Sequence, residues 1–202
     1  ASAKLRSQAL IKARTAKSEA DRLRAVRVAG LDVLELSLQN LKEVKVTPDL
    51  VILNVGDNRL ERLPSLFWCA SLRYLRVTNN RLGELPDLPP LEILRANRNE
   101  LGRLPEVPSL RDLDASSNRL KSVVLHSELL YLNLASNQLE AVDIPLGVRD
   151  VDVSSNKLTS LQTMAPYVNA SMNQLREIEA PQARHLDVSM NSLTRLPELR
   201  KI

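Results

Sequence analysis

The chain has 202 residues, a formal net charge of +4, 39 Leu and only five aromatic residues. One Cys and two His provide too few ligands for a structural zinc site, and a single thiol cannot form an internal disulfide bond. The five Gly form neither a GxGxxG nor a GxxxxGK[ST] motif, which argues against a nucleotide-binding fold. The composition therefore predicts no cofactor.

Residues 1–30 hold most of the positive charge, with eight Lys or Arg against two acids. Small or apolar residues recur there at spacings of three and four, at Leu5, Ala9, Ala13, Ala16, Ala20 and Leu23. This pattern predicts one or two amphipathic helices. We expect the segment to cap the first coil of the structure that follows. Contact with an anionic membrane through the same basic helix is the less favoured alternative, because alanine is a weak membrane anchor.

From Leu31 onward the pattern L-x-x-L-x-[LVA]-x-x-N-x-L recurs nine times, starting at residues 31, 50, 72, 91, 110, 129, 148, 165 and 183. Positions 4 and 6 are apolar in every copy and lie on the same face of a short strand. One short strand cannot bury that face alone, so neighbouring copies must stack. We predict an α/β solenoid with a parallel concave sheet over residues 31–202, and residues 1–30 as its N-terminal α-helical cap.

Position 9 is Asn in all copies except the first, which has Gln39. We expect this Asn to turn inward at the bend, where its amide can pair with backbone groups. The convex segments often contain Leu-Pro, which predicts extended or irregular chain. The second copy is longer, so its residues 66–70 could form a helical turn. There we expect Phe67 or Trp68 to pack beneath the convex side, the alternative being an exposed contact.

The repeats resemble the bacterial "LPX" class of leucine-rich repeats, through LPDLPP at residues 85–90 and LPEVP at residues 104–108. That class occurs in the YopM and IpaH-like effectors that bacteria deliver into host cells by type III secretion. The resemblance implies a virulence-related protein that is secreted into the host cytoplasm. Copies five to seven lack the Leu-Pro tail, and the second copy is closer to eukaryotic repeats. A eukaryotic cytoplasmic scaffold or regulatory domain is therefore the alternative. Cys69 lies inside a repeat, so no ligase role of IpaH-like proteins is transferred to it.

Positions 3, 5 and 7 of each copy point away from the core and should line the concave face. All three Tyr lie at position 3, and Tyr is enriched in binding hot spots. Acids outnumber bases at these positions, which is the wrong sign for nucleic acid. We therefore predict a protein-recognition module, and the resemblance implies that it is the host-target-recognition part of a larger effector. The predicted contact residues are Tyr74, Arg76, Ile93, Arg95, Asp112, Asp114, Tyr131, Asn133, Asp150, Asp152 and Tyr167.

An alternative of another class is a metal-dependent or hydrolytic enzyme that uses the concave carboxylates, which form pairs at Asp112/Asp114 and Asp150/Asp152. His185, Asp187 and Ser189 also share one strand face, but about 13 Å of strand separates the first from the last. We therefore predict no catalytic residue, no metal site and no small-molecule substrate. His126 is expected to be an ordinary surface residue.

Overall fold

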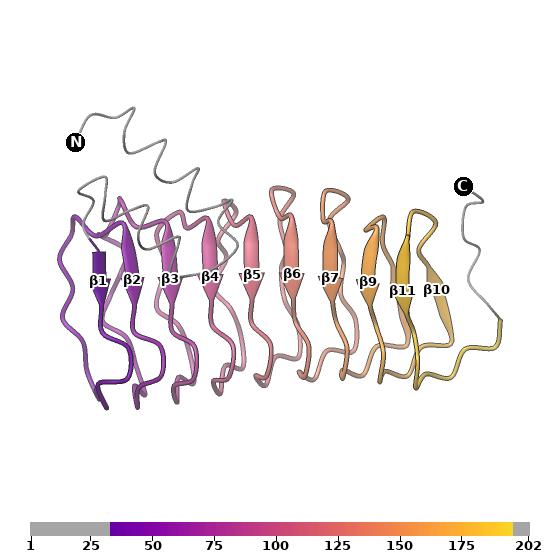
Figure 1. Ribbon diagram of the computed structural model, residues 1–202, viewed down its shortest axis with the longest axis horizontal. Coiled ribbons are helices and arrows are strands. Elements are labelled where there is room, and N and C mark those ends of the chain that lie inside the picture. The colour runs from indigo at the N-terminus through magenta and orange to yellow at the C-terminus, as the bar shows by residue number, and fades with distance from the viewer. Residues whose placement is uncertain (1–32, 196–202) are drawn as a thin grey trace.

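The computed structural model describes residues 33–195, so the predicted cap at residues 1–30 lies outside the described range. The described chain forms stacked coils, and each coil adds one strand to a nine-stranded parallel sheet (Figure 1). In sheet order the strands are β1 (Val33–Glu35), β2 (Ile52–Asn54), β3 (Tyr74–Arg76), β4 (Ile93–Arg95), β5 (Asp112–Asp114), β6 (Tyr131–Asn133), β7 (Asp150–Asp152), β9 (Tyr167–Asn169) and β11 (His185–Asp187). Every strand occupies positions 3 to 5 of a predicted copy, which confirms the leucine-rich repeat solenoid.

The hydrophobic core lies between this sheet and the convex segments. Positions 4, 6 and 11 fill it in each coil, as Leu53, Val55 and Leu60 do in the second copy, where all three are fully buried. Because the same positions recur in every coil, the core runs continuously along the solenoid rather than forming one central cluster.

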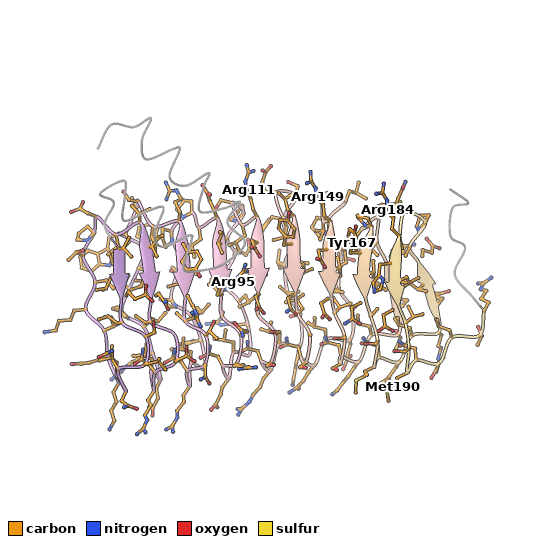
Figure 2. All side chains as sticks on the ribbon, in the orientation of Figure 1. Arg95, Arg111, Arg149, Tyr167, Arg184 and Met190 are labelled. Carbon is orange, nitrogen blue, oxygen red and sulfur yellow. The ribbon has the colours of Figure 1, made fainter. Side chains whose placement is uncertain are left out.

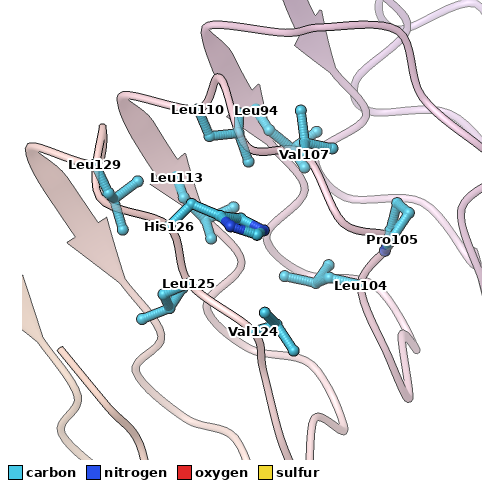
Figure 3. A pocket seen from close by; sticks show the side chains of 10 residues that line it. All are labelled: Leu94, Leu104, Pro105, Val107, Leu110, Leu113, Val124, Leu125, His126 and Leu129. Atoms are coloured by element: carbon cyan, nitrogen blue, oxygen red, sulfur yellow. The ribbon is translucent and has the colours of Figure 1, made fainter. Parts of the chain in front are cut away.

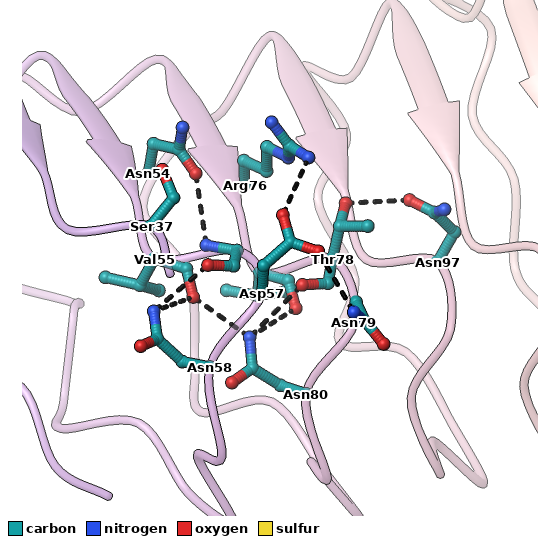
Figure 4. A network of polar contacts seen from close by, with 12 residues as sticks. Ser37, Asn54, Val55, Asp57, Asn58, Arg76, Thr78, Asn79, Asn80 and Asn97 are labelled. Carbon is teal, nitrogen blue, oxygen red and sulfur yellow. Dashed lines mark hydrogen bonds and ion pairs between the residues drawn. The ribbon is translucent and has the colours of Figure 1, made fainter. Parts of the chain in front are cut away.

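The Asn at position 9 forms the inward polar ladder that the sequence predicts (Figure 4). Oδ1 of Asn80 accepts the backbone N–H of Leu60 in the preceding coil at 2.9 Å. Its Nδ2 donates to the carbonyls of Val55 at 2.9 Å and Val77 at 3.0 Å, one in each coil. These bonds pair backbone groups that the bend would otherwise leave buried and unsatisfied. The ladder therefore ties each coil to the coil before it.

Position 8, which directly precedes this Asn, has a left-handed backbone in all nine copies, with φ between 53° and 59°. The residues there are Leu38, Asp57, Asn79, Arg98, Ser117, Ser136, Ser155, Met172 and Met190. None is Gly, although a left-handed conformation is unfavourable for residues with a side chain. The stacked coils impose this conformation at the same point of every turn.

The convex side differs from the expectation of extended or irregular segments in one place. Strands β8 (Ser160–Gln162) and β10 (Glu177–Glu179) form a second, two-stranded parallel sheet there. Their coils are shorter than the others and contain no Pro in these strands, so the backbone N–H groups are free to pair. In the second, third and fourth copies Pro64, Pro86 and Pro105 interrupt the corresponding segments.

The long second coil also differs from expectation. Residues 66–72 form two hydrogen-bonded turns instead of a helical turn, through Cys69 N–H to the Leu66 carbonyl and Leu72 N–H to the Cys69 carbonyl. Phe67 and Trp68 are 73% and 60% exposed, so the expectation that one packs beneath the convex side is wrong. The turns bury Leu66 and Cys69 and direct the aromatic rings outward. Within residues 33–195 no helix could span a membrane.

Candidate protein-binding face

The strand register aligns the concave side chains into rows that cross the sheet. Position 3 forms the row Val33, Ile52, Tyr74, Ile93, Asp112, Tyr131, Asp150, Tyr167 and His185. This row is apolar over β1–β4, which we call the apolar half of the concave face. Over β5–β11, which we call the acidic half, positions 3, 5 and 7 carry five Asp and no Lys or Arg. All eleven predicted contact residues lie on this face, in both halves.

In the apolar half, three of the four position-3 side chains are almost inaccessible to solvent. Ile52, Tyr74 and Ile93 are only 1%, 5% and 6% exposed, although they lie on the opposite face of the sheet from the main core. Tyr74 and Ile93 are therefore buried in this structure, and their role as contact residues stays a prediction. At position 5 of β3, Arg76 is half-buried and pairs with Asp57 at 3.3 Å.

The boundary between the halves is an ion pair between β4 and β5. Nη1 and Nη2 of Arg95 donate to the two carboxylate oxygens of Asp112, at 2.6 Å and 2.5 Å. The Arg95 side chain is 21% exposed and the Asp112 side chain 17%. Burial disfavours the charged guanidinium, but its hydrogen bonds and attraction to Asp112 prevail and raise the pKa of Arg95. Each of these two predicted contact residues thus satisfies the other within the sheet.

The acidic half is open. Tyr131 and Tyr167 are 46% and 51% exposed, in contrast to Tyr74 at the same repeat position. Asp150 lies between them in the position-3 row and is also exposed. An open groove of about 380 Å³ runs along this surface, with Asp114, Tyr131, Asn133, Asp150 and Asp152 among its lining residues. These five predicted contact residues of the acidic half therefore line one open groove.

The carboxylates at position 5 have a structural task that the sequence analysis missed. Oδ1 of Asp114 accepts both the N–H and the hydroxyl of Ser116, at 3.0 Å and 2.7 Å, and Asp152 engages Ser154 in the same way. Such contacts stabilise the turn that leads into the left-handed position 8. The recurring D-x-S pattern is the signal that could have revealed this task.

The suspected catalytic arrangement on β11 belongs to the same turn motif. The Asp187 carboxylate accepts the N–H of Ser189 at 2.9 Å. This bond and the contact with the Ser189 hydroxyl lower the pKa of Asp187. Ser189 is therefore a turn residue whose backbone and hydroxyl both engage Asp187. In residues 33–195, no cluster of three or more His, Cys, Asp or Glu side chains is suited to hold a metal ion.

His126 is not the ordinary surface residue that the sequence suggests. Its Nε2 is buried and lacks a hydrogen-bond partner in the described part of the chain. The ring borders a small cavity of about 20 Å³ lined mostly by apolar side chains, including Leu94, Val107 and Leu113 (Figure 3). This volume suffices for one water molecule, but an ordered water needs two or more polar partners. The cavity therefore offers little chemistry for ligand recognition.

A row of arginines at position 2 was also missed, because only positions 3, 5 and 7 were assigned to the face. Arg111, Arg149 and Arg184 are exposed and lie along the edge where β5, β7 and β11 begin (Figure 2). Arg111 approaches Glu128 at 3.6 Å. The acidic groove is thus bordered on one side by positive charge.

No protein-family model and no curated protein sequence matches this chain. Among solved structures, YopM from Yersinia enterocolitica WA-314 is 36% identical, covers 76% of this chain and superposes with a TM-score of 0.71. YopM from Yersinia pestis, a leucine-rich effector protein, is 30% identical and covers 83%, with a TM-score of 0.52. A Shigella effector LRR domain, 23% identical over 96% of the chain with a TM-score of 0.52, shares the fold. The chain spans only 36% and 62% of the two YopM chains.

Proposed function

This chain is a leucine-rich repeat solenoid that resembles the YopM and IpaH-type effectors, and we propose that it recognises a partner protein through the acidic half of its concave face. One observation carries the proposal. Tyr131 lines the open groove and is exposed, as is Tyr167 on a nearby strand of the same face, whereas Tyr74 is buried at the same repeat position in the apolar half. A partner would therefore meet the acidic half first.

The chemistry of the groove suits a protein surface. Tyrosine offers a large, rigid contact area and a hydroxyl, and it is enriched among residues that dominate binding energies. The surrounding carboxylates add a charge pattern that favours a partner of opposite sign and guides its approach. The rigid sheet holds both features in fixed register, which lowers the entropic cost of binding.

The structural likeness to secreted effectors supports a more specific proposal. We infer that this chain is the host-target-recognition part of a bacterial effector that acts in the host cytoplasm. Residues 1–30 are proposed to cap the solenoid, since an uncovered first coil would expose core residues. In this proposal the chain binds its target and performs no chemistry on it.

The test compares two pairs of exposed aromatic residues that lie on different surfaces. Tyr131→Ala/Tyr167→Ala removes the concave pair, and Phe67→Ala/Trp68→Ala removes a pair from the second convex segment. Each variant is immobilised and exposed to a eukaryotic cell lysate, and its melting temperature is recorded. We expect the concave variant to lose a protein that the unchanged chain and the convex variant retain, with both variants still folded. Loss of the protein from the convex variant alone would place the contact elsewhere.

A further inference from the structure

We propose that Tyr131, Asp150 and Tyr167 form a clamp for a single arginine side chain of the partner. The proposal rests on the proposed function and names the chemistry that the acidic half recognises. Its basis is the arrangement of these three residues in adjacent strands, together with an ion pair elsewhere on the same sheet that shows how this position of the repeat engages a guanidinium.

The register places the three residues side by side. Tyr131 on β6 pairs with Asp150 on β7, and Asp150 pairs with Tyr167 on β9. Neighbouring strands lie about 4.8 Å apart, so the backbones of the two Tyr are about 9.6 Å from one another. That separation admits one planar cation between the two rings, above the carboxylate of the middle strand.

Within residues 33–195, neither an ion pair nor a side-chain hydrogen bond engages the Asp150 carboxylate, which is exposed. An arginine can donate two parallel hydrogen bonds to a carboxylate and stack its flat guanidinium on an aromatic ring. Lysine carries a compact charge that cannot do both at once. Two tyrosines that flank one carboxylate therefore favour arginine, with attraction to the ring faces adding to the ion pair.

The sheet contains an internal example of this recognition. Asp112 lies at position 3 of β5, and Arg95 at position 5 of the preceding strand binds it through two nitrogens. Asp150 has the equivalent place on β7, but position 5 of the preceding strand is Asn133. The same site in the repeat thus has an arginine in one case and lacks it in the other. We infer that the partner supplies the missing guanidinium.

The neighbouring arginines do not fill this place. Arg111 and Arg149 lie at the edge of the sheet where the strands begin, away from the position-5 row that holds Arg95 (Figure 2). No ion pair joins either of them to Asp150 in the part of the chain that the structure describes. Their positive charge instead restricts the orientation of a basic partner, because a second cation of the partner at that edge of the sheet would be repelled.

The experiment titrates the full chain with a capped pentapeptide that has one arginine among glycines, and follows backbone amide shifts by NMR at constant ionic strength. A second peptide carries citrulline, the neutral isostere of arginine. We expect the arginine peptide to shift the amides of Tyr131, Asp150 and Tyr167 in a saturable manner, and the citrulline peptide to leave them in place. Equal shifts from both peptides, or no shifts from either, would overturn the clamp.

Three variants sharpen the result. Asp150→Asn should lower the affinity for the arginine peptide at least fivefold. Asp143→Asn removes an exposed acid from the convex side and should leave that affinity unchanged. Asn133→Arg supplies the guanidinium within the chain, as Arg95 does for Asp112, and should abolish peptide binding while the protein stays folded. Binding that survives both Asp150→Asn and Asn133→Arg contradicts the clamp. The capture experiment on the Tyr131/Tyr167 variant decides the proposed function separately, because it requires no arginine peptide.

Discussion

In the apolar half of the concave face Ile52, Tyr74 and Ile93 at position 3 are buried, whereas in the acidic half Tyr131, Asp150 and Tyr167 at the same position are exposed. Both halves have the same strand length, the same parallel register and the same Asn ladder. The backbone therefore does not decide which part of the face is open. The position-3 side chains differ between the halves, while the stack of coils stays the same.

The comparison also separates two uses of one residue type. Asp112 at the boundary is neutralised by Arg95, while Asp150 in the acidic half has no such partner in the described chain. Asp114 and Asp152 hold turns through Ser116 and Ser154. Some carboxylates of the acidic half thus stabilise the fold, and others are exposed to solvent. The exposed carboxylates are the ones that we expect to bind a partner.

We expect the largest loss of stability when the Asn at position 9 is removed, and this change tests whether the coils of the two halves are held together in the same way. Asn80→Ala in the apolar half and Asn137→Ala in the acidic half each remove one accepted and two principal donated hydrogen bonds to backbone groups. We expect each change to lower the free energy of unfolding by about 3 kcal/mol, because buried backbone groups lose their partners. Urea denaturation measures the free energy of unfolding of both variants. Clearly unequal losses would show that the halves differ in more than their surface residues.

A matched pair at position 3 tests the difference between the halves directly. Ile93→Ala should cost about 2–3 kcal/mol of stability, because a buried side chain leaves a cavity. Tyr131→Ala, which truncates an exposed ring, should cost less than about 1 kcal/mol. Thermal and urea unfolding compare the two variants with the unchanged chain. Similar costs at both positions would contradict the assignment of a closed and an open half.

The boundary ion pair gives an intermediate effect. A double-mutant cycle on Arg95→Ala and Asp112→Ala should reveal a coupling of about 1–2 kcal/mol, because the pair is bidentate and largely shielded from water. Arg103 and Glu84 form the control pair, with side chains 82% and 72% exposed, and should couple by less than about 0.5 kcal/mol. If the two cycles agree, the boundary pair is an ordinary surface contact.

The smallest effect concerns the left-handed position 8, which both halves contain. Arg98→Gly and Ser136→Gly relieve an unfavourable backbone conformation, with φ of 56° and 57°, and should stabilise the chain by up to about 0.5 kcal/mol each. The added flexibility of Gly in the unfolded chain offsets part of the gain. Melting temperatures of the two variants provide the measurement. A marked loss of stability at either site would mean that its side chain has a further role.

The architecture could be predicted almost completely from the sequence because each coil repeats the same constraints. Leu60 and Leu82 recur at position 11, Asn80 and Asn99 recur at position 9, and these spacings leave one way to bury the apolar faces. The convex pairing of β8 with β10 was missed, since it depends on short coils whose convex strands contain no Pro, which the consensus pattern does not describe.

The accessibility of the face could not be predicted in the same way. Tyr74, Tyr131 and Tyr167 occupy one repeat position, and the sequence pattern alone gives them the same environment. Their burial depends on what lies over and beside them in three dimensions. Likewise, Arg95 and Asp112 are 17 residues apart and become a bidentate pair only through the register of β4 and β5.

The central claim is that the acidic half, and not another exposed surface, meets the partner protein. A photo-crosslinking amino acid placed singly at Tyr131, Tyr167 or Phe67 in the full chain tests it in a eukaryotic cell extract. The account predicts a discrete adduct from Tyr131 and Tyr167 and none from Phe67. Excess unlabelled chain should suppress that adduct, whereas excess Tyr131→Ala/Tyr167→Ala chain should not. A discrete adduct from Phe67 without one from either Tyr would contradict the account.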